Sequence, residues 1–243
     1  MEHLKVLQQE YLTFEQAEVI SNGIKRYIAE VGPEMLPKEP EDIVAQYKTG
    51  QSLVLEHNGE IVFHATGYEN LNNEQVSNLG FQVVELGSWI AMLRGQGVGK
   101  VGAVELLRRN QKVFGDDVIF LATHKRMNAL NISKNDLEFH EVLYEDFPYL
   151  AYLTCTCDNC SESYGFQSCP FRSKQIGNIP DEKGKIDCTL VISSIENAKA
   201  FESRCREESQ RLGLPVLDAG GIISTERMKI AKDFFDRIGQ TDQ

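Results

Sequence analysis

The stretch Arg94-Gly95-Gln96-Gly97-Val98-Gly99 decides how this sequence is interpreted. It joins an expected strand, residues 81–91, to an expected helix, residues 100–114. Amides at the start of a helix carry a partial positive charge, and glycines let a bound group approach them closely. The stretch therefore predicts a site for phosphate oxygens, and a glycine-rich turn without a ligand is the simpler alternative.

Three kinds of pyrophosphate site compete for these glycines. Gly97, Gly99 and Gly102 match the dinucleotide fingerprint, and Asp116 or Asp117 lies nearly the right distance beyond for a ribose hydroxyl. However, that fingerprint normally follows the first strand of a parallel unit, whereas here helices and a hairpin come first. A nucleotide-triphosphate loop fits less well, because Lys100 is followed by valine and not by the Ser or Thr that holds magnesium. The third kind depends on the order of the elements around the turn.

That order is indicated by the spacing of apolar residues. Before the turn we expect a strand at 4–8, helices at 14–31 and 41–49, and strands at 52–56 and 60–66 joined across Asn58-Gly59. After it we expect a strand at 118–123, a helix at 128–135, strands at 137–145 and 186–193, a helix capped by Ser193, and a helix at 224–238. The fold class is α+β, with a mixed, mostly antiparallel sheet flanked by helices.

This succession resembles the GNAT superfamily of acetyl-coenzyme A-dependent N-acetyltransferases. Arg94, Gly97 and Gly99 match the family signature Q/R-x-x-G-x-G/A, and residues 85–90 look like its central strand. The resemblance covers about residues 1–147, with a further strand at 186–193. We therefore expect a GNAT-like domain at 1–193, including a Cys-rich insertion at 148–185, and a helical C-terminal extension at 194–243.

The resemblance implies a site for acetyl-coenzyme A. The coenzyme A pyrophosphate would be held by the signature Arg94 and by the amides of Gly95, Gln96, Gly97, Val98, Gly99 and Lys100. The end of the preceding strand, Ile90, Ala91 and Met92, would bind the acetyl-pantetheine arm. Asn128, at the start of a later helix, would also touch the cofactor.

The same resemblance implies direct attack of an amine on the thioester in a ternary complex. The protein must then align the two reactants, accept a proton and stabilise the developing oxyanion. Glu85 on the central strand is the candidate base, and an outward-facing structural carboxylate is its alternative. His124, expected just after a strand, is a candidate proton relay. The family's tyrosine acid is replaced by Lys134, and Tyr144 is a distant substitute.

Four cysteines are concentrated in a segment that has little apolar surface of its own. Cys155, Cys157, Cys160 and Cys169 form C-x-C-x2-C-x8-C. Four thiolates suit a tetrahedral, structural zinc ion, which would order such a segment. Reduced, unligated thiols and an iron–sulfur cluster are the alternatives.

Composition limits the partners. The formal charge of −11 argues against nucleic acid or an anionic membrane as the main partner. No apolar run is long enough to cross a bilayer, and we expect a cytoplasmic protein. The acceptor would be a small-molecule amine or a protein amino group, and the C-terminal helices would pack on the sheet or form a homodimer. The alternatives are a non-catalytic acyl-coenzyme A or metal sensor and an NAD(P)-dependent oxidoreductase.

Overall fold

A computed structural model describes residues 4–7, 12–31, 37–69, 73–93, 95–115, 117–154 and 172–239. Their contacts divide into two compact units. Unit 1 holds the described residues of Met1–Tyr68 and Leu86–Asp116, and unit 2 holds those of Glu69–Glu85, Asp117–Asn159 and Ser163–Gln243. Within the described residues, no helix combines the length and the apolar character that crossing a membrane would require.

Unit 1 is built around a hairpin. Its strands follow the order β1 (Leu4–Val6), β2 (Ser52–His57), β3 (Glu60–Glu69) and the later part of β4 (Val83–Ala91). Strand β2 is antiparallel to both β1 and β3. The expected tight turn is confirmed, because Asn58 and Gly59 both have positive φ, 54° and 83°.

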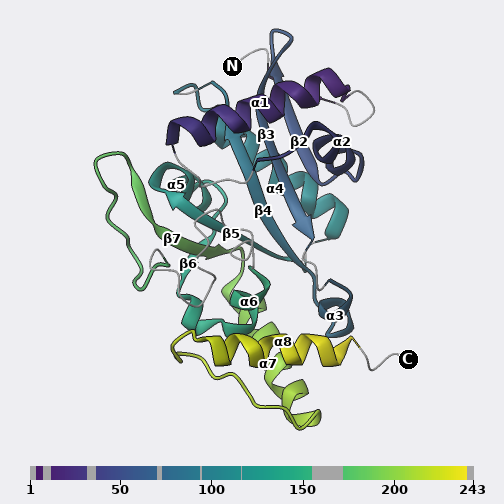
Figure 1. The fold of residues 1–243 in the computed structure, drawn as a ribbon, viewed down its shortest axis with the longest axis vertical. Helices are drawn as coiled ribbons and strands as arrows, with labels where there is room; N and C mark the ends of the chain where they lie inside the picture. The colour runs from purple at the N-terminus through teal and green to yellow at the C-terminus, as the bar shows by residue number, and fades with distance from the viewer. Residues whose placement is uncertain are drawn as a thin grey trace. The chain divides into compact units, whose positions relative to one another are not determined.

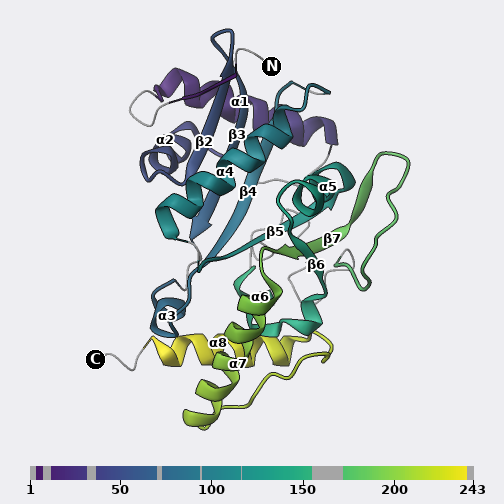
Figure 2. The ribbon, with the colours of Figure 1, turned by 180° about the vertical axis from the view of Figure 1, so that it is seen from behind.

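Helices cover both faces of these strands. Helices α1 (Phe14–Val31) and α2 (Pro40–Lys48) lie on one face, where their apolar side chains share a core with Val54 and Ile90. Helix α4 (Val98–Phe114) lies on the opposite face, as Figure 1 and Figure 2 show. A Cβ on Gly102 would come within 2.4 Å of the Phe63 ring, so this glycine lets α4 lie close to β3.

Unit 2 contains the parallel part of the sheet. The beginning of β4 runs parallel to β5 (Ile119–Arg126), and β7 (Lys185–Ile192) is antiparallel to β5 and to β6 (His140–Val142). The whole sheet has the order β1-β2-β3-β4-β5-β7-β6. The predicted fold class, a mixed and mostly antiparallel sheet with flanking helices, is therefore confirmed.

The helices of unit 2 share one large core with its strands. They are α3 (Asn73–Asn78), α5 (Met127–Asn135), the 3-10 turn η2 (Tyr144–Asp146), α6 (Pro148–Leu153), α7 (Ile195–Arg211) and α8 (Thr225–Ile238). Phe201, Phe234 and Phe235 are fully buried in this core, among residues of β5, β7 and α6. The C-terminal helices therefore pack on the rest of their own unit.

Three local expectations differ from the structure. Residues 148–153, assigned to the Cys-rich insertion, form the buried helix α6. The strand expected over 137–145 is limited to His140–Val142, because a turn with positive φ at Glu138 precedes it and η2 follows. The α7 cap is Ser194, whose side chain accepts from the Asn197 amide, while Ser193 instead accepts from the Phe120 amide.

Candidate cofactor site

The glycine turn has the geometry of an anion-binding loop. Gly95 and Gly97 have left-handed φ values of 77° and 72°, whereas Gln96 between them does not, so the backbone alternates in hand. Alternation of this kind turns successive amides toward one side of the chain. All three residues are exposed. A Cβ on Gly95 would meet nothing within 4 Å, so conformation and not space calls for glycine there.

The start of α4 adds further donors. The amide of Val101 donates to the Gly97 carbonyl at 3.1 Å. The amides of Val98 and Gly99 precede that bond and have no carbonyl of the helix to donate to. The helix is 17 residues long and has no acidic residue in its first turn, so its positive end is not neutralised there. These amides can therefore bind phosphate oxygens.

The end of β4 is tied into unit 1. Ile90 is buried in the core beneath α1 and α2. The amide of Met92 donates to the Val62 carbonyl at 2.8 Å, so it is not available to an acyl arm. The Met92 side chain lies against Gly23 of α1, where an added Cβ would be 2.8 Å from its terminal methyl. A cofactor contact of Met92 would thus use its carbonyl or side chain, and half-exposed Ala91 stays a candidate.

Several expected site residues lie outside the described part of the chain. They are Arg94 of the signature, Asp116, and the four cysteines Cys155, Cys157, Cys160 and Cys169. Groups of three or more metal-binding side chains are absent from the residues that the structure describes. The zinc prediction therefore stays a prediction.

Strand register now fixes the position of Glu85. It lies opposite Leu121 in the parallel β4–β5 pair and is half-buried. Because side chains alternate along a strand, Glu85 shares a face with Val83, which belongs to the core of unit 2. Its carboxylate is therefore at the margin of that core and not on a fully exposed face.

His124 is placed differently from the expectation. It lies within β5 and not after it, is only 5% exposed, and is hydrogen-bonded through Nε2 to the Ser133 hydroxyl of α5 at 2.8 Å. Burial lowers the pKa of His124 to about 4. The ring is therefore neutral at physiological pH and joins β5 to α5.

The remaining candidates take different environments. Asn128 is exposed in the first turn of α5, as expected of a residue that meets a ligand. Tyr144 is 1% exposed in the core of unit 2, with its hydroxyl 3.5 Å from the Cys188 sulfur. Lys134 pairs with Glu141 at 2.7 Å and thereby links α5 to β6. Asn128 and Lys134 are exposed, whereas Tyr144 is buried.

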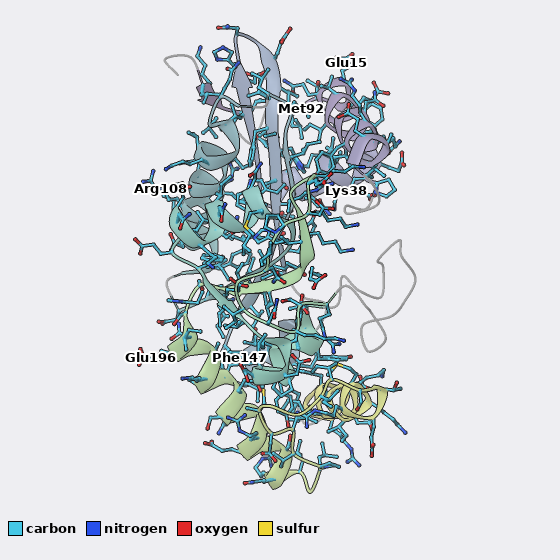
Figure 3. All side chains as sticks on the ribbon, turned by 90° about the vertical axis from the view of Figure 1, so that its left-hand side faces the viewer. Glu15, Lys38, Met92, Arg108, Phe147 and Glu196 are labelled. Carbon is cyan, nitrogen blue, oxygen red and sulfur yellow. The ribbon has the colours of Figure 1, made fainter. Side chains whose placement is uncertain are left out.

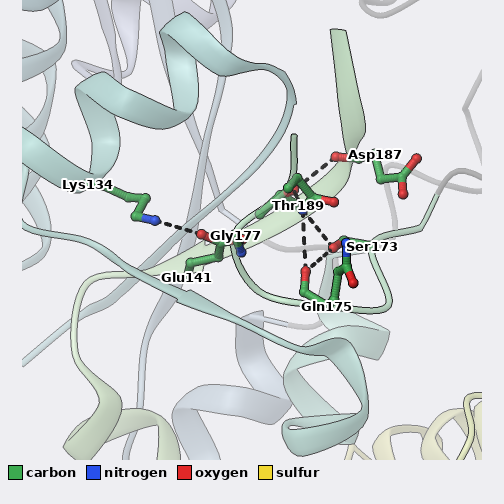
Figure 4. A network of polar contacts seen from close by, with 8 residues as sticks. Lys134, Glu141, Ser173, Gln175, Gly177, Asp187 and Thr189 are labelled. Carbon is green, nitrogen blue, oxygen red and sulfur yellow. Dashed lines mark hydrogen bonds and ion pairs between the residues drawn. The ribbon is translucent and has the colours of Figure 1, made fainter. Parts of the chain in front are cut away.

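A polar network that the sequence did not reveal anchors the chain just after the cysteine segment (Figure 4). Asn178 donates to the hydroxyls of Ser173 and Thr189 at 2.8 and 2.9 Å. Glu141 accepts from the Gly177 amide at 2.8 Å. Both contacts hold residues 173–178 to strands β6 and β7.

The dinucleotide alternative is weakened by strand direction. Asp117 lies two residues before β5, whose first residue, Ile119, donates to the Gln82 carbonyl just before β4. The glycine turn instead follows the end of β4. Dinucleotides bind at the carboxyl ends of parallel strands, so an acid for the ribose belongs at the end of β5.

No protein-family model and no curated protein sequence matches the chain. Among solved structures, it is similar to a putative acetyltransferase from Salmonella typhimurium with acetyl-CoA, at 14% identity and TM-score 0.45, over 58% of this chain and 81% of that one. A diaminobutyrate acetyltransferase from Paenibacillus lautus has 11% identity and TM-score 0.46, over 78% and 93% of the two chains.

An N-acetylglutamate synthase from Neisseria gonorrhoeae has 10% identity and TM-score 0.49, over 78% of this chain. The chain spans only 34% of that protein's length. These TM-scores are below 0.5 and the identities are low, so the likenesses do not themselves define an activity for this chain.

Proposed function

We propose that this protein is a GNAT-type N-acyltransferase that moves an acetyl or other acyl group from acyl-coenzyme A to an amine. The observation that carries the proposal is the exposed turn at Gly95–Gly97, whose left-handed glycines lead into the amides that begin α4. The order of elements around this turn supports it, because it is the order on which the GNAT resemblance rests. Exposed Asn128 suits a cofactor contact.

The reaction requires a proton acceptor and an aligned amine. The coenzyme supplies an activated thioester, and the amides of the glycine turn hold its pyrophosphate. Glu85, which is half-buried, is the candidate base, acting directly or through water. His124 is neutral at physiological pH and bonded to Ser133, so it serves as a hydrogen-bonding support of β5 and not as a charged relay. Tyr144 remains a candidate acid only if its buried hydroxyl becomes accessible.

A ligand panel tests the proposal. Acetyl-coenzyme A, NADPH, ATP and a chelator are each added in a thermal-denaturation assay, since a ligand of the folded state raises its midpoint. Release of coenzyme A is then followed across a panel of amines. We expect stabilisation by acetyl-coenzyme A and turnover with some amines. Stabilisation without turnover would favour the sensor alternative, and stabilisation by NADPH alone would favour the oxidoreductase.

We also propose that the four cysteines bind one structural zinc ion in a cytoplasmic protein. Four thiolates leave no open position for water, so the ion would order the segment and take no part in acyl transfer. Metal analysis after anaerobic purification should give one zinc per chain. Absence of both zinc and iron would leave reduced thiols. A homodimer is tested separately, by sedimentation with and without metal.

A further inference from the structure

A polar cluster lies beneath the link between α1 and α2, within unit 1. It consists of Lys38, His64, Tyr68 and Ser88, from that link, from β3 and from β4. In Figure 3, Lys38 lies on the α1 and α2 side of the strands, and Arg108 of α4 lies on the opposite side. The cluster occupies the face that elsewhere buries the apolar residues of α1 and α2. Its polarity therefore needs an explanation other than packing.

Lys38 is held in place from several directions. The Ser21 hydroxyl of α1 donates to the Lys38 carbonyl at 2.7 Å. The Lys38 ammonium lies 4.4 Å from the centre of the Tyr68 ring and donates to Gln46 Oε1 at 3.3 Å. These contacts restrain the side chain before any ligand arrives, so less freedom is lost when one binds.

The ammonium is incompletely compensated. Burial lowers the pKa of Lys38 to about 8, and the nearby carboxylate of Asp42 opposes this only in part. The titratable groups around it are Asp42 from α2 and His64 from β3, and burial lowers the pKa of His64 to about 3. His64 is thus neutral above that pH. An anion bound beside Lys38 would stabilise the ammonium and so oppose the lowering of its pKa by burial.

The Tyr68 and Ser88 hydroxyls supply further hydrogen-bonding groups. They are bonded to each other, which brings both hydroxyl groups to one point of the cluster. Ser88 has φ 50°, a left-handed value that is uncommon for serine within a strand and that departs from the regular strand there. His64 adds a buried Nδ1 that makes no hydrogen bond of good geometry among the described residues, while the Ser88 backbone is close enough to raise the pKa of the ring slightly against the effect of burial. A buried polar atom without a good hydrogen bond lowers the stability of the folded protein, so its presence in this cluster calls for an explanation.

The position of Ser88 along β4 relates the cluster to the acyl arm. Ser88 precedes Ile90–Met92, the segment assigned above to acetyl-pantetheine, by two to four residues. A strand rises about 3.3 Å per residue, so this is roughly 7–13 Å. A single molecule carrying both an amine and an anionic group can bridge such a distance.

We propose that Lys38, with the hydroxyls of Tyr68 and Ser88, binds the carboxylate of an amino-carboxylate acceptor whose amine lies several carbon atoms away, such as an amino acid with an amine at the end of its side chain. This inference rests on the proposed acyl transfer for the role of the bound molecule. The single positive charge of the ammonium suits a singly charged carboxylate, and nearby Asp42 disfavours the extra charge of a phosphate.

Matched acceptors test the proposal. Each amino acid is compared with its carboxamide, which keeps the amine and removes the negative charge. We expect the wild-type kcat/KM to favour the acids at least tenfold. Lys38→Gln should abolish that preference by lowering only the values for the acids, Lys38→Arg should restore part of it, and Tyr68→Phe should weaken it.

The control is Lys25→Gln, since Lys25 is an exposed lysine of α1 paired with Glu39 and should leave the preference intact. Thermal denaturation of each variant checks folding. The preference should also fall by about tenfold per pH unit above pH 8, as the ammonium loses its proton. Equal kcat/KM for acids and amides, or an equal fall for both in Lys38→Gln, would overturn the proposal. A phosphate preference, with phosphoethanolamine favoured over β-alanine, would also overturn it.

A binding measurement keeps this inference separate from the proposed function. Calorimetry of glutarate with the coenzyme A-saturated protein needs no turnover. Binding that Lys38→Gln removes would support the carboxylate site even if no amine is acylated, which would then count only against the transferase. Turnover of amines with no glutarate binding and no preference for acids would count only against the carboxylate site.

Discussion

Replacement of Gly97 by glutamate should weaken acyl-coenzyme A binding much more than replacement of Gly115, the glycine at the other end of α4. Both glycines have left-handed φ, 72° and 91°, and both flank the same helix. A residue with a Cβ costs about 1–2 kcal/mol at Gly97 and more at Gly115, whose ψ of −176° places it in a region that essentially only glycine adopts. Both variants also gain one negative charge, so the Kd values of the folded variants compare a charge near the proposed pyrophosphate with a charge far from it.

The magnitude follows from Coulomb's law. Charges about 5 Å apart repel by roughly 0.8 kcal/mol in the water-like dielectric of an exposed loop. Two pyrophosphate charges then give about 1.7 kcal/mol, which is about a 20-fold rise in Kd. Calorimetric titration with acetyl-coenzyme A measures the Kd of each variant. Added salt should reduce the difference in Kd between the variants, because it screens the repulsion. Equal Kd values for Gly97→Glu, Gly115→Glu and wild type would refute the phosphate assignment.

Substitutions of Glu85, His124 and Glu202 probe single groups. Glu85→Gln should lower kcat at least tenfold with an unchanged Kd for acetyl-coenzyme A, and full activity would remove Glu85 as base. The contribution of His124 to the free energy of unfolding should fall by about 3 kcal/mol as pH drops from 6.5 to about 4, because the buried ring resists the proton that the unfolded chain takes up. This contribution is measured as the difference in pH dependence between the wild type and His124→Gln, and exposed His140→Gln should show no such difference. Urea titrations across that range decide it. Glu202→Gln should change the free energy of unfolding by under about 1 kcal/mol at pH 6. Glu202→Ala leaves two helix amides unpaired and should lower it by about 2–5 kcal/mol. Equal losses in the two variants would contradict a protonated Glu202.

The environment of Glu202 determines in which direction its contribution to stability changes with pH. Burial raises the pKa of this carboxyl to about 8, while its hydrogen bonds from the Tyr149 and Leu150 amides and the charge of Arg206 oppose the rise. Its protonated form is favoured in the folded protein, so this contribution to stability is complete below about pH 4.5 and is lost as pH rises through about 8. Above pH 8, Glu202→Gln should therefore be more stable than the wild type.

The features that the sequence predicted well are those set by local chemistry. Asn58-Gly59 formed the expected turn because positive φ restricts residue type. Thr13 and Gln16 have the spacing of a capping box, which satisfies free amides at a helix start, and they exchange the corresponding hydrogen bonds where α1 begins. The glycine turn belongs to the same class. Each of these depends on residues that are close together in the chain.

Features that depend on tertiary contacts could not be predicted in this way. Helix α6 is six residues long and apolar on all sides, so it has no helical periodicity to detect. In the sequence, Ser193 and Ser194 are equally suitable caps. In the structure the Ser193 hydroxyl accepts from the Phe120 amide of β5, and Ser194 caps α7. The meeting of Lys38 with Tyr68 depends on how α1 and α2 cross the strands. Only the folded chain brings those two residues together.

The most direct test of the central claim follows the backbone amides themselves. In a nitrogen–proton correlation spectrum, acetyl-coenzyme A should shift the resonances of Gly95, Gly97 and Gly99 with one saturable Kd, and dephosphorylated pantetheine should not shift them. The resonance of Gly115, at the far end of α4, should remain in place. Saturable binding that leaves the three turn glycines unmoved, or shifts produced by NADPH and not by acetyl-coenzyme A, would contradict the account.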